Sequence, residues 1–247
     1  MKKEIIIFLL PVFLMGSDFS ELFKKANKNA ENSEYIEAIR DYELLLEEGY
    51  KNRILYYNLG NAYYRNNQLG LALWAYYRAQ RLMPRDPDLL HNIKVAKAKC
   101  IDRIEYPKSL IFFELFLKIK NSIKFSELTI IGSILFFIGS ILVVVKKTEL
   151  VSSKLINYLI SFCIILFFLN SVLSISRYKF ENNEKYGVVI SNSINVFSGP
   201  VENQNSILFL INEGLKVKLN NFQDKWVEVQ LIDGKKGWVN VWSIREI

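Results

Sequence analysis

Few residues in this chain carry side chains with catalytic chemistry. There is one histidine, His91, and there are two cysteines, Cys100 and Cys163. A nucleophilic triad needs a base beside its nucleophile, and a structural metal site needs several clustered ligands. A single histidine without a partner meets neither requirement, and no pair of carboxylates marks a pocket. The sequence therefore predicts a protein that is not an enzyme and has no cofactor or metal site.

The charge and hydropathy of the chain point to the membrane rather than to nucleic acid. The net charge of +7 is spread without a dense basic cluster, so no nucleic-acid partner is expected. Residues 1–17 combine a basic start with a short apolar run, which is typical of a signal peptide or an N-terminal anchor. Two longer uncharged runs predict transmembrane helices over residues 127–146 and 155–176.

The loop between the two predicted spans is short and carries Lys146, Lys147 and Lys154. Positive loops stay in the cytoplasm, but the segments that flank the spans are basic as well. The export signal at the N-terminus therefore decides the orientation. We therefore expect the regions before and after this membrane hairpin to lie outside the cytoplasm, at the inner membrane. Gly132 and Gly139, which fall on one helix face, would allow the second span to approach closely.

A sequence repeat organises the region before the spans. Gly60, Ala72 and Tyr76 fall on Ala26, Ala38 and Tyr42 when the sequence is shifted by one period. This pattern resembles the tetratricopeptide repeat family, whose period of about 34 residues is the same. The resemblance implies an all-α solenoid over residues 18–104, made of two helix pairs and a capping helix that begins near Asp86 or Asp88.

Small residues in this region are interpreted as packing devices. In such a repeat, Gly60, Ala72 and Ala79 would lie where two helices cross, with the rings of Tyr63, Tyr76 and Trp74 around them. Two repeats with a cap are fewer than a stable stack usually needs. We therefore expect the array to be supported by the membrane, by a partner or by a second copy of the chain, so an oligomer is one possibility.

The resemblance also implies a concave groove that binds peptides and is lined by the first helix of each pair. Amides could bind an extended peptide backbone and an arginine could bind a carboxylate; an ordinary solvated polar face is the alternative. Asn61 and Arg65 are expected to point away from the helix crossing. The groove positions would be Asn27, Glu31, Tyr57, Asn58, Asn61, Tyr64, Arg65, His91 and Asn92.

The C-terminal part changes from helical to alternating periodicity. Residues 105–126 suggest an amphipathic linker on the membrane surface. Residues 184–247 form short alternating segments, with a hairpin turn at Asp233-Gly234, and the segments "NVFSGP", "KWVEV" and "DGKKGWV" resemble bacterial SH3-like domains. A small all-β barrel is implied. Val227 and Val229 would point inward, while Trp226 and Trp238 would either form a binding platform or close the barrel.

The order of these parts defines a multidomain membrane protein. The whole arrangement, with "LLHNIKVAKAKCIDRIE" at the end of the array, resembles the BatE proteins of the bacterial aerotolerance (Bat) operons. The resemblance implies a non-enzymatic membrane scaffold that works alongside von Willebrand A-type Bat proteins and a MoxR-type ATPase. The alternative function is a peptidoglycan-binding module that recruits a cell-wall enzyme.

Overall fold

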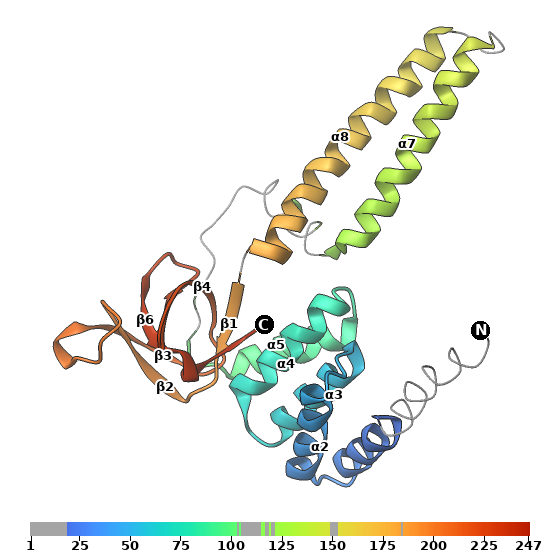
Figure 1. Ribbon diagram of the computed structural model, residues 1–247. Coiled ribbons are helices and arrows are strands. Elements are labelled where there is room, and N and C mark those ends of the chain that lie inside the picture. The colour runs from blue at the N-terminus through green and yellow to red at the C-terminus, as the bar shows by residue number, and fades with distance from the viewer. Residues whose placement is uncertain are drawn as a thin grey trace, which may run out of the picture. The chain divides into compact units, whose positions relative to one another are not determined.

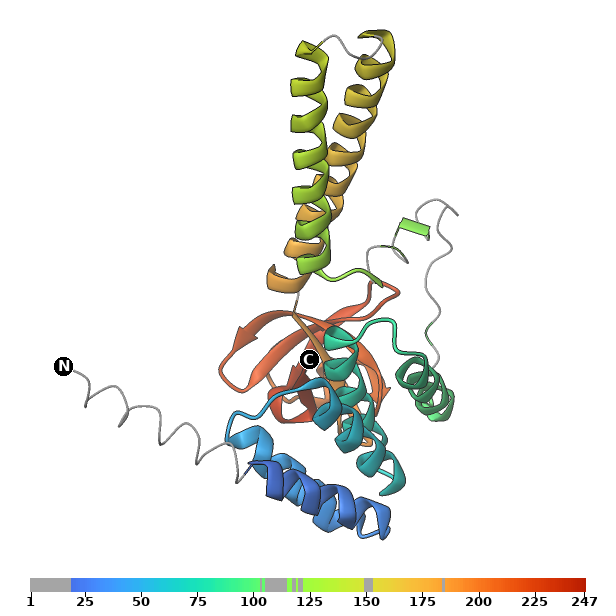
Figure 2. The same cartoon turned by 90° about the vertical axis from the view of Figure 1, so that its right-hand side faces the viewer.

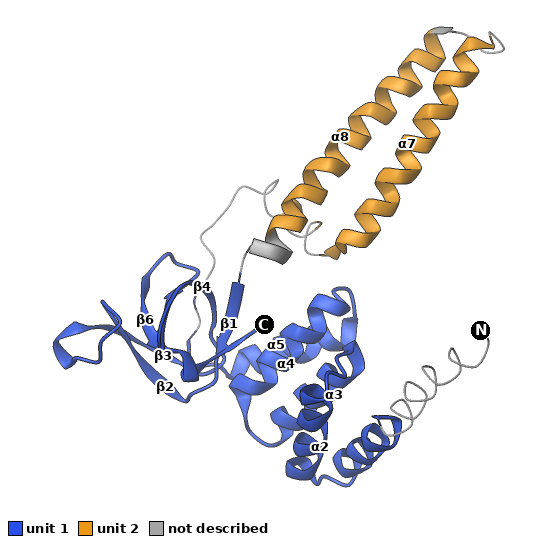
Figure 3. Ribbon diagram, viewed as in Figure 1, with its two compact units in different colours: residues 1–107, 185–247 blue, residues 108–184 orange. Residues whose placement is uncertain are grey.

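The computed structural model describes residues 19–102, 104, 115–116, 119, 122–148, 153–183 and 185–247. The chain divides into two compact units, residues 1–107 with 185–247 and residues 108–184 (Figure 3). The predicted signal or anchor over residues 1–17 lies outside the described residues. Most of the predicted linker over residues 105–126 does so as well.

The first unit begins with an array of helices, called the helical array below. Residues 19–31 form a helix, followed by α2 (Tyr35–Glu47), α3 (Arg53–Arg65), α4 (Leu69–Leu82) and α5 (Pro87–Lys99) (Figure 1). The Asn52 and Asp86 side chains cap α3 and α5 by accepting from backbone N–H groups three residues on, at 2.8 and 2.9 Å. Pro87 starts α5, where a missing N–H costs nothing.

The turns inside the two helix pairs repeat as well. Ser33 and Asn67, which correspond to each other in the two copies, both have a positive φ, 67° and 60°. The backbone N–H after each of them donates to the carbonyl five residues back, Glu34 to Asn29 and Gln68 to Tyr63. This is the Schellman ending of a helix, which needs a left-handed residue at that position. Both turns therefore share one geometry.

The helices of the second pair approach closely at Gly60. A Cβ placed there would lie 2.5 Å from Cδ1 of Tyr76. Ala72 and Ala79, in the facing helix, are fully buried, which agrees with the expected crossing. Trp74 of α4 makes an edge-to-face contact with Tyr56 of α3, with 6.0 Å between ring centres. Its indole also contacts the C-terminal part of the chain.

The C-terminal part, called the β domain below, is one antiparallel sheet. Its strands are β1 (Lys185–Val189), β2 (Ser193–Phe197), β3 (Ile207–Asn212), β4 (Lys216–Gln223), β5 (Trp226–Gln230), β6 (Lys236–Asn240) and β7 (Ile244–Glu246). They are ordered β3-β2-β6-β5-β4-β1-β7. Val227, Val229 and Leu231 are buried, as their parity predicts, and Asp233-Gly234 forms the turn between β5 and β6.

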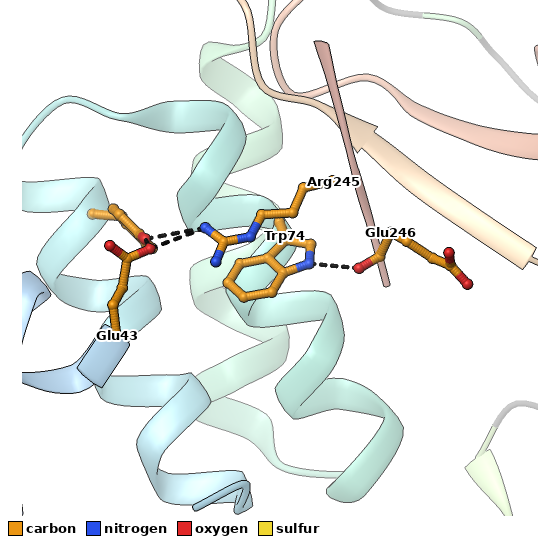
Figure 4. Close-up of polar contacts among 5 residues, drawn as sticks. Glu43, Trp74, Arg245 and Glu246 are labelled. Carbon is orange, nitrogen blue, oxygen red and sulfur yellow. Dashed lines mark hydrogen bonds and ion pairs between the residues drawn. The ribbon is translucent and has the colours of Figure 1, made fainter. Parts of the chain in front are cut away.

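The β domain packs directly against the helical array, and Figures 1 and 2 both show the two side by side. Trp74 of α4 donates its indole N–H to the carbonyl oxygen of Glu246 at 2.7 Å, and the guanidinium of Arg245 lies 3.8 Å from the centre of the Trp74 ring system (Figure 4). Arg245 also pairs with Glu43 of α2 at 3.1 Å and donates to the Tyr63 hydroxyl of α3 at 3.3 Å. A single strand thus contacts three helices.

Further contacts tie the two parts at other points. The Gly70 backbone N–H donates to the Glu213 carboxylate at 3.2 Å, and a Cβ at Gly70 would lie 2.5 Å from the carbonyl oxygen of Val189. Only glycine at position 70 allows the β domain to approach α4 this closely. Asp102, just after α5, accepts two hydrogen bonds from Asn212, at 2.6 and 3.0 Å.

These contacts show a support for the array that the sequence analysis does not predict. Val188 and Ile247 of the β domain belong to the same buried apolar cluster as Leu73 and Tyr77 of α4. The helical array shares its core with the β domain of its own chain. None of the three supports expected from sequence, a membrane, a partner or a second copy, is needed to cover this face of α4.

Lys216 of β4 lies in the same interface. Its ammonium group is 4.9 Å from the centre of the Tyr77 ring and 4.8 Å from that of Tyr186. Burial lowers the pKa of Lys216 to about 8, and the positive charges of Lys97 and Arg81 contribute to that lowering. Cation–π attraction to the two rings compensates only part of the hydration free energy that the ammonium group loses on burial.

The second unit contains two long apolar helices, α7 (Phe125–Lys147) and α8 (Ser153–Asn183). By length and composition both can cross a membrane, and the predicted spans 127–146 and 155–176 lie within them. The Asn170 amide donates to the Leu128 carbonyl oxygen at 3.1 Å and would lie 2.8 Å from a Cβ at Gly132. Gly132 therefore makes the close approach expected of it, whereas Gly139 has no neighbour there.

Gly60→Leu should unfold the helical array, because the added side chain would enter the space of the Tyr76 ring. Overpacking of this kind costs roughly 1–3 kcal/mol or more. Thermal unfolding of the full chain in detergent, followed by far-ultraviolet circular dichroism, measures the effect. Gly199→Leu is the control, since a Cβ at Gly199 meets nothing within 4 Å. Equal melting temperatures for the two variants would contradict the close crossing.

Lys216 makes a pH dependence of stability that Lys216→Met should lack. The folded pKa of about 8 is below the ordinary 10.5, so the unfolded chain binds more protons between these values. The free energy of unfolding therefore rises with pH across that window, and it is lowered by a constant amount below it. Burial also raises the pKa of Cys100 and Tyr42, which acts in the opposite direction at high pH.

Subtracting the free energy of unfolding of Lys216→Met from that of the wild type at each pH cancels the contributions of Cys100 and Tyr42. We expect the wild type to gain stability relative to the variant from pH 8 upward, measured by chemical denaturation at several pH values. A difference that stays flat over this range would mean that Lys216 is well hydrated and the interface is open.

Candidate binding groove

A hydrogen-bonded group of three side chains occurs twice in the helical array. In the first copy, the Asn27 side-chain oxygen accepts from the Tyr42 hydroxyl at 2.7 Å and from the Asn58 amide at 2.9 Å. In the second copy, Asn61 accepts from Tyr76 at 2.8 Å and from Asn92 at 3.0 Å. The corresponding residues are one repeat period apart in all three cases. Each group joins three consecutive helices.

Two hollows on the surface of the array contain most of the predicted groove residues. One of about 540 Å³ is lined by Asn27, Glu31, Asn58, Asn61 and Arg65, among others. Another of about 390 Å³ is lined by Asn61, Tyr64, Arg65, His91 and Asn92, with Tyr76 and Val95. They share Asn61 and Arg65, so the structure brings these candidates together along one continuous surface, called the groove below.

Tyr57 is the predicted groove residue that lines neither hollow. Its hydroxyl accepts a hydrogen bond from the Asn92 amide at 3.2 Å, and its ring centre is 6.4 Å from that of Tyr76. Tyr57 therefore supports the groove by holding Asn92.

Asn61 has a structural role that the sequence analysis missed. Its side chain does not simply point away from the crossing, because its oxygen holds both Tyr76 and Asn92. Tyr76 is buried, and burial raises the pKa of its hydroxyl well above the ordinary value. Loss of the Asn61 oxygen would leave a buried hydroxyl without its acceptor, which costs about 1–3 kcal/mol. Asn61 cannot be replaced without an effect on stability.

Arg65 is the candidate best placed to meet a ligand. It is exposed at the end of α3 and lines both hollows. It makes no hydrogen bond or ion pair with any residue that the structure describes. Glu31 lines the first hollow with it, and Lys99 lies 4.3 Å from the centre of the Tyr64 ring at the second. The groove thus offers one uncommitted guanidinium among amides and tyrosines.

His91 and Cys100 show no sign of nucleophilic chemistry. His91 is exposed at the second hollow. Cys100 is buried beside Leu73 and Gly214, and burial raises the pKa of its thiol to about 11. A protonated thiol is a poor nucleophile. No cluster of metal-binding side chains occurs among the described residues.

The two tryptophans of the proposed platform lie on one face of the β domain. Trp226 is paired with Asn240 and Trp238 with Glu228, so the rings occupy diagonal positions on β5 and β6. Both are partly exposed, and Trp226 makes an edge-to-face contact with the buried Phe197, with 5.5 Å between ring centres. Trp226 therefore covers part of the sheet in addition to offering an exposed edge.

Sequence reasoning missed the residues that join the array to the β domain. The sequence signal was the unbroken apolar run from Ala72 to Tyr77 in α4, and all of these residues are buried in the structure. A helix that is apolar on every side must be covered on every side. No protein-family model matches the chain, and no curated protein shows significant similarity to it.

Proposed function

We propose that the protein is a non-enzymatic scaffold, anchored in the membrane, that binds partner polypeptides in the groove. The observation that carries this proposal is the twofold occurrence of the Asn–Tyr–Asn group, with its members one repeat period apart. That period, the Schellman turns and the close crossing at Gly60 support a tetratricopeptide array. Arg65 is exposed and lies where the two hollows of the groove meet.

The groove has the chemistry for an extended peptide. Asn58 donates one N–H inward to Asn27, and Asn92 donates to both Tyr57 and Asn61. The side-chain oxygens of both residues and the second N–H of Asn58 are left for a ligand. Peptide backbones present alternating donors and acceptors that such amides can match. Arg65 adds a site for a carboxylate, which it could bind with two parallel hydrogen bonds.

The β domain supports the same interpretation. Its short antiparallel strands, the turn at Asp233-Gly234 and the buried valines of β5 agree with an SH3-like domain. Its firm contact with the array means that both parts would be presented to a partner together. Trp226 and Trp238 give the β domain a second candidate contact surface.

The membrane anchor consists of α7 and α8 in this proposal, with both flanking regions outside the cytoplasm. The arrangement of parts resembles the BatE proteins, and we propose von Willebrand A-type Bat proteins as partners in the groove. The scaffold would work alongside a MoxR-type ATPase system. Topology can be tested with an impermeant maleimide in intact spheroplasts. Cys100 is too buried for this purpose, so a cysteine at Ile101, which is 76% exposed, is the better label site.

Arg65→Ala should weaken partner binding about tenfold or more and leave the fold unchanged. The side chain is exposed and holds no described residue, so the stability change should stay within about 0.5 kcal/mol. Loss of a charge-assisted hydrogen bond costs about 1.5–3 kcal/mol, or tenfold or more in affinity. A photo-crosslinking amino acid at His91, in the second hollow, would capture the partner from intact membranes before purification.

Arg53→Ala is the matched control, since Arg53 is also exposed and lies at the other end of α3. It should retain the crosslinked product, whereas Arg65→Ala should lose most of it. Crosslinking that persists in Arg65→Ala would place the contact elsewhere, with the surface at Trp226 as the next candidate. Asn61→Ala is expected to lower the melting temperature and therefore cannot serve as a binding variant.

A further inference from the structure

The end of α8 and the start of the β domain are separated by one residue. The uncharged run of α8 ends at Ser176, and Arg177 and Lys179 follow it. The helix continues to Asn183, and β1 begins at Lys185. If Lys179 marks the edge of the hydrocarbon, four helical residues add about 6 Å. Two more residues add at most about 7 Å.

This reach, at most about 13 Å, covers the headgroup layer and about 5–8 Å beyond it. A bilayer of about 40–45 Å with a hydrocarbon core of about 30 Å leaves roughly 5–8 Å on each side. With the hydrocarbon edge at Lys179, the length of the chain keeps Lys185 within about 8 Å of the outer edge of the headgroup layer. Side chains that touch Lys185 share this position.

The side chain beside Lys185 is an exposed aromatic ring. The Lys185 ammonium group lies 5.5 Å from the centre of the Phe222 ring, at the end of β4. Phe222 is 52% exposed, and the neighbouring tip of the β4–β5 hairpin, from Asn221 to Lys225, is exposed throughout. Burial of such an exposed apolar ring lowers its free energy. The boundary between the headgroups and the acyl chains of a membrane can bury it.

The charges around Phe222 are balanced. Lys185 lies 3.8 Å from the Glu246 carboxylate, and Lys225 follows Asp224 in the chain. Attraction to anionic lipid is therefore small, and burial of the ring provides the main driving force. A bilayer of zwitterionic lipid should be sufficient as the binding surface.

We propose that the tip of the β4–β5 hairpin, with Phe222 at its centre, docks into the headgroup layer of the membrane that α8 crosses. This inference rests on the membrane anchoring proposed above. Because the β domain and the helical array share one core, the contact would also fix the height of the groove above the membrane. Lys185 can extend its ammonium group to the water while its stem covers the ring.

The experiment uses the full chain in zwitterionic liposomes, with Cys100→Ala and Cys163→Ala. The probe is the fluorophore NBD attached to a cysteine at Gln223, next to Phe222. We expect a blue-shifted emission and quenching by lipids that carry a shallow nitroxide, reduced roughly twofold or more in Phe222→Asp. NBD at Val201, which is 64% exposed at the β2–β3 hairpin, is the matched control and should report water.

Resistance to carbonate extraction separates the two proposals. Integrated protein whose emission at position 223 equals that at position 201 would overturn docking and leave the anchored scaffold intact. Protein that carbonate removes would overturn the membrane anchor and the docking with it. Quenching that is unchanged in Phe222→Asp would also contradict the proposal, because the ring would then have no part in the contact.

Discussion

The structure of the first unit depends on the apolar contact between α4 and the edge of the β domain. Val188 and Ile247 enter the same buried cluster as Leu73 and Tyr77. Trp74 and Arg245 close the contact with a hydrogen bond, a stacked guanidinium and an ion pair to Glu43. A short stack of helix pairs buries too little surface to be stable alone. The β domain therefore acts as the missing neighbour of the array.

This division of contacts leaves the groove available. On α3, Tyr63 faces the interface through Glu43 and Arg245, whereas Asn61 faces the groove through Tyr76 and Asn92. One helix thus serves two surfaces with residues two positions apart. The β domain supports the helices away from the groove, and Arg65 stays exposed at the groove.

The repeat could be predicted from the sequence because its contacts recur at a fixed spacing. Gly60, Tyr76 and Asn61 each have a counterpart one period earlier, and the alternation in β5 separates buried from exposed positions. The interface could not be predicted in this way, because Trp74 and Glu246 are 172 residues apart and no period relates them. Trp74 contacts both Tyr56 of α3 and the β domain, and the sequence predicts only the first contact because it lies within the repeat. The sequence predicts Asn61 as a ligand residue, because the identity of an amide does not reveal which groups of the protein it binds.

The most direct test of this dependence is hydrogen–deuterium exchange of the full chain in detergent after a charge swap at the interface. Arg245→Glu places two carboxylates together at Glu43 and removes the cation from the Trp74 ring. Our account predicts that amides of α2, α3 and α4 lose protection along with β7, while β5 and β6 keep theirs. Adding Glu43→Arg should restore part of that protection, because the ion pair reforms with its charges exchanged. Unchanged exchange in α2, α3 and α4 of Arg245→Glu would contradict the claim that the array is held by the β domain.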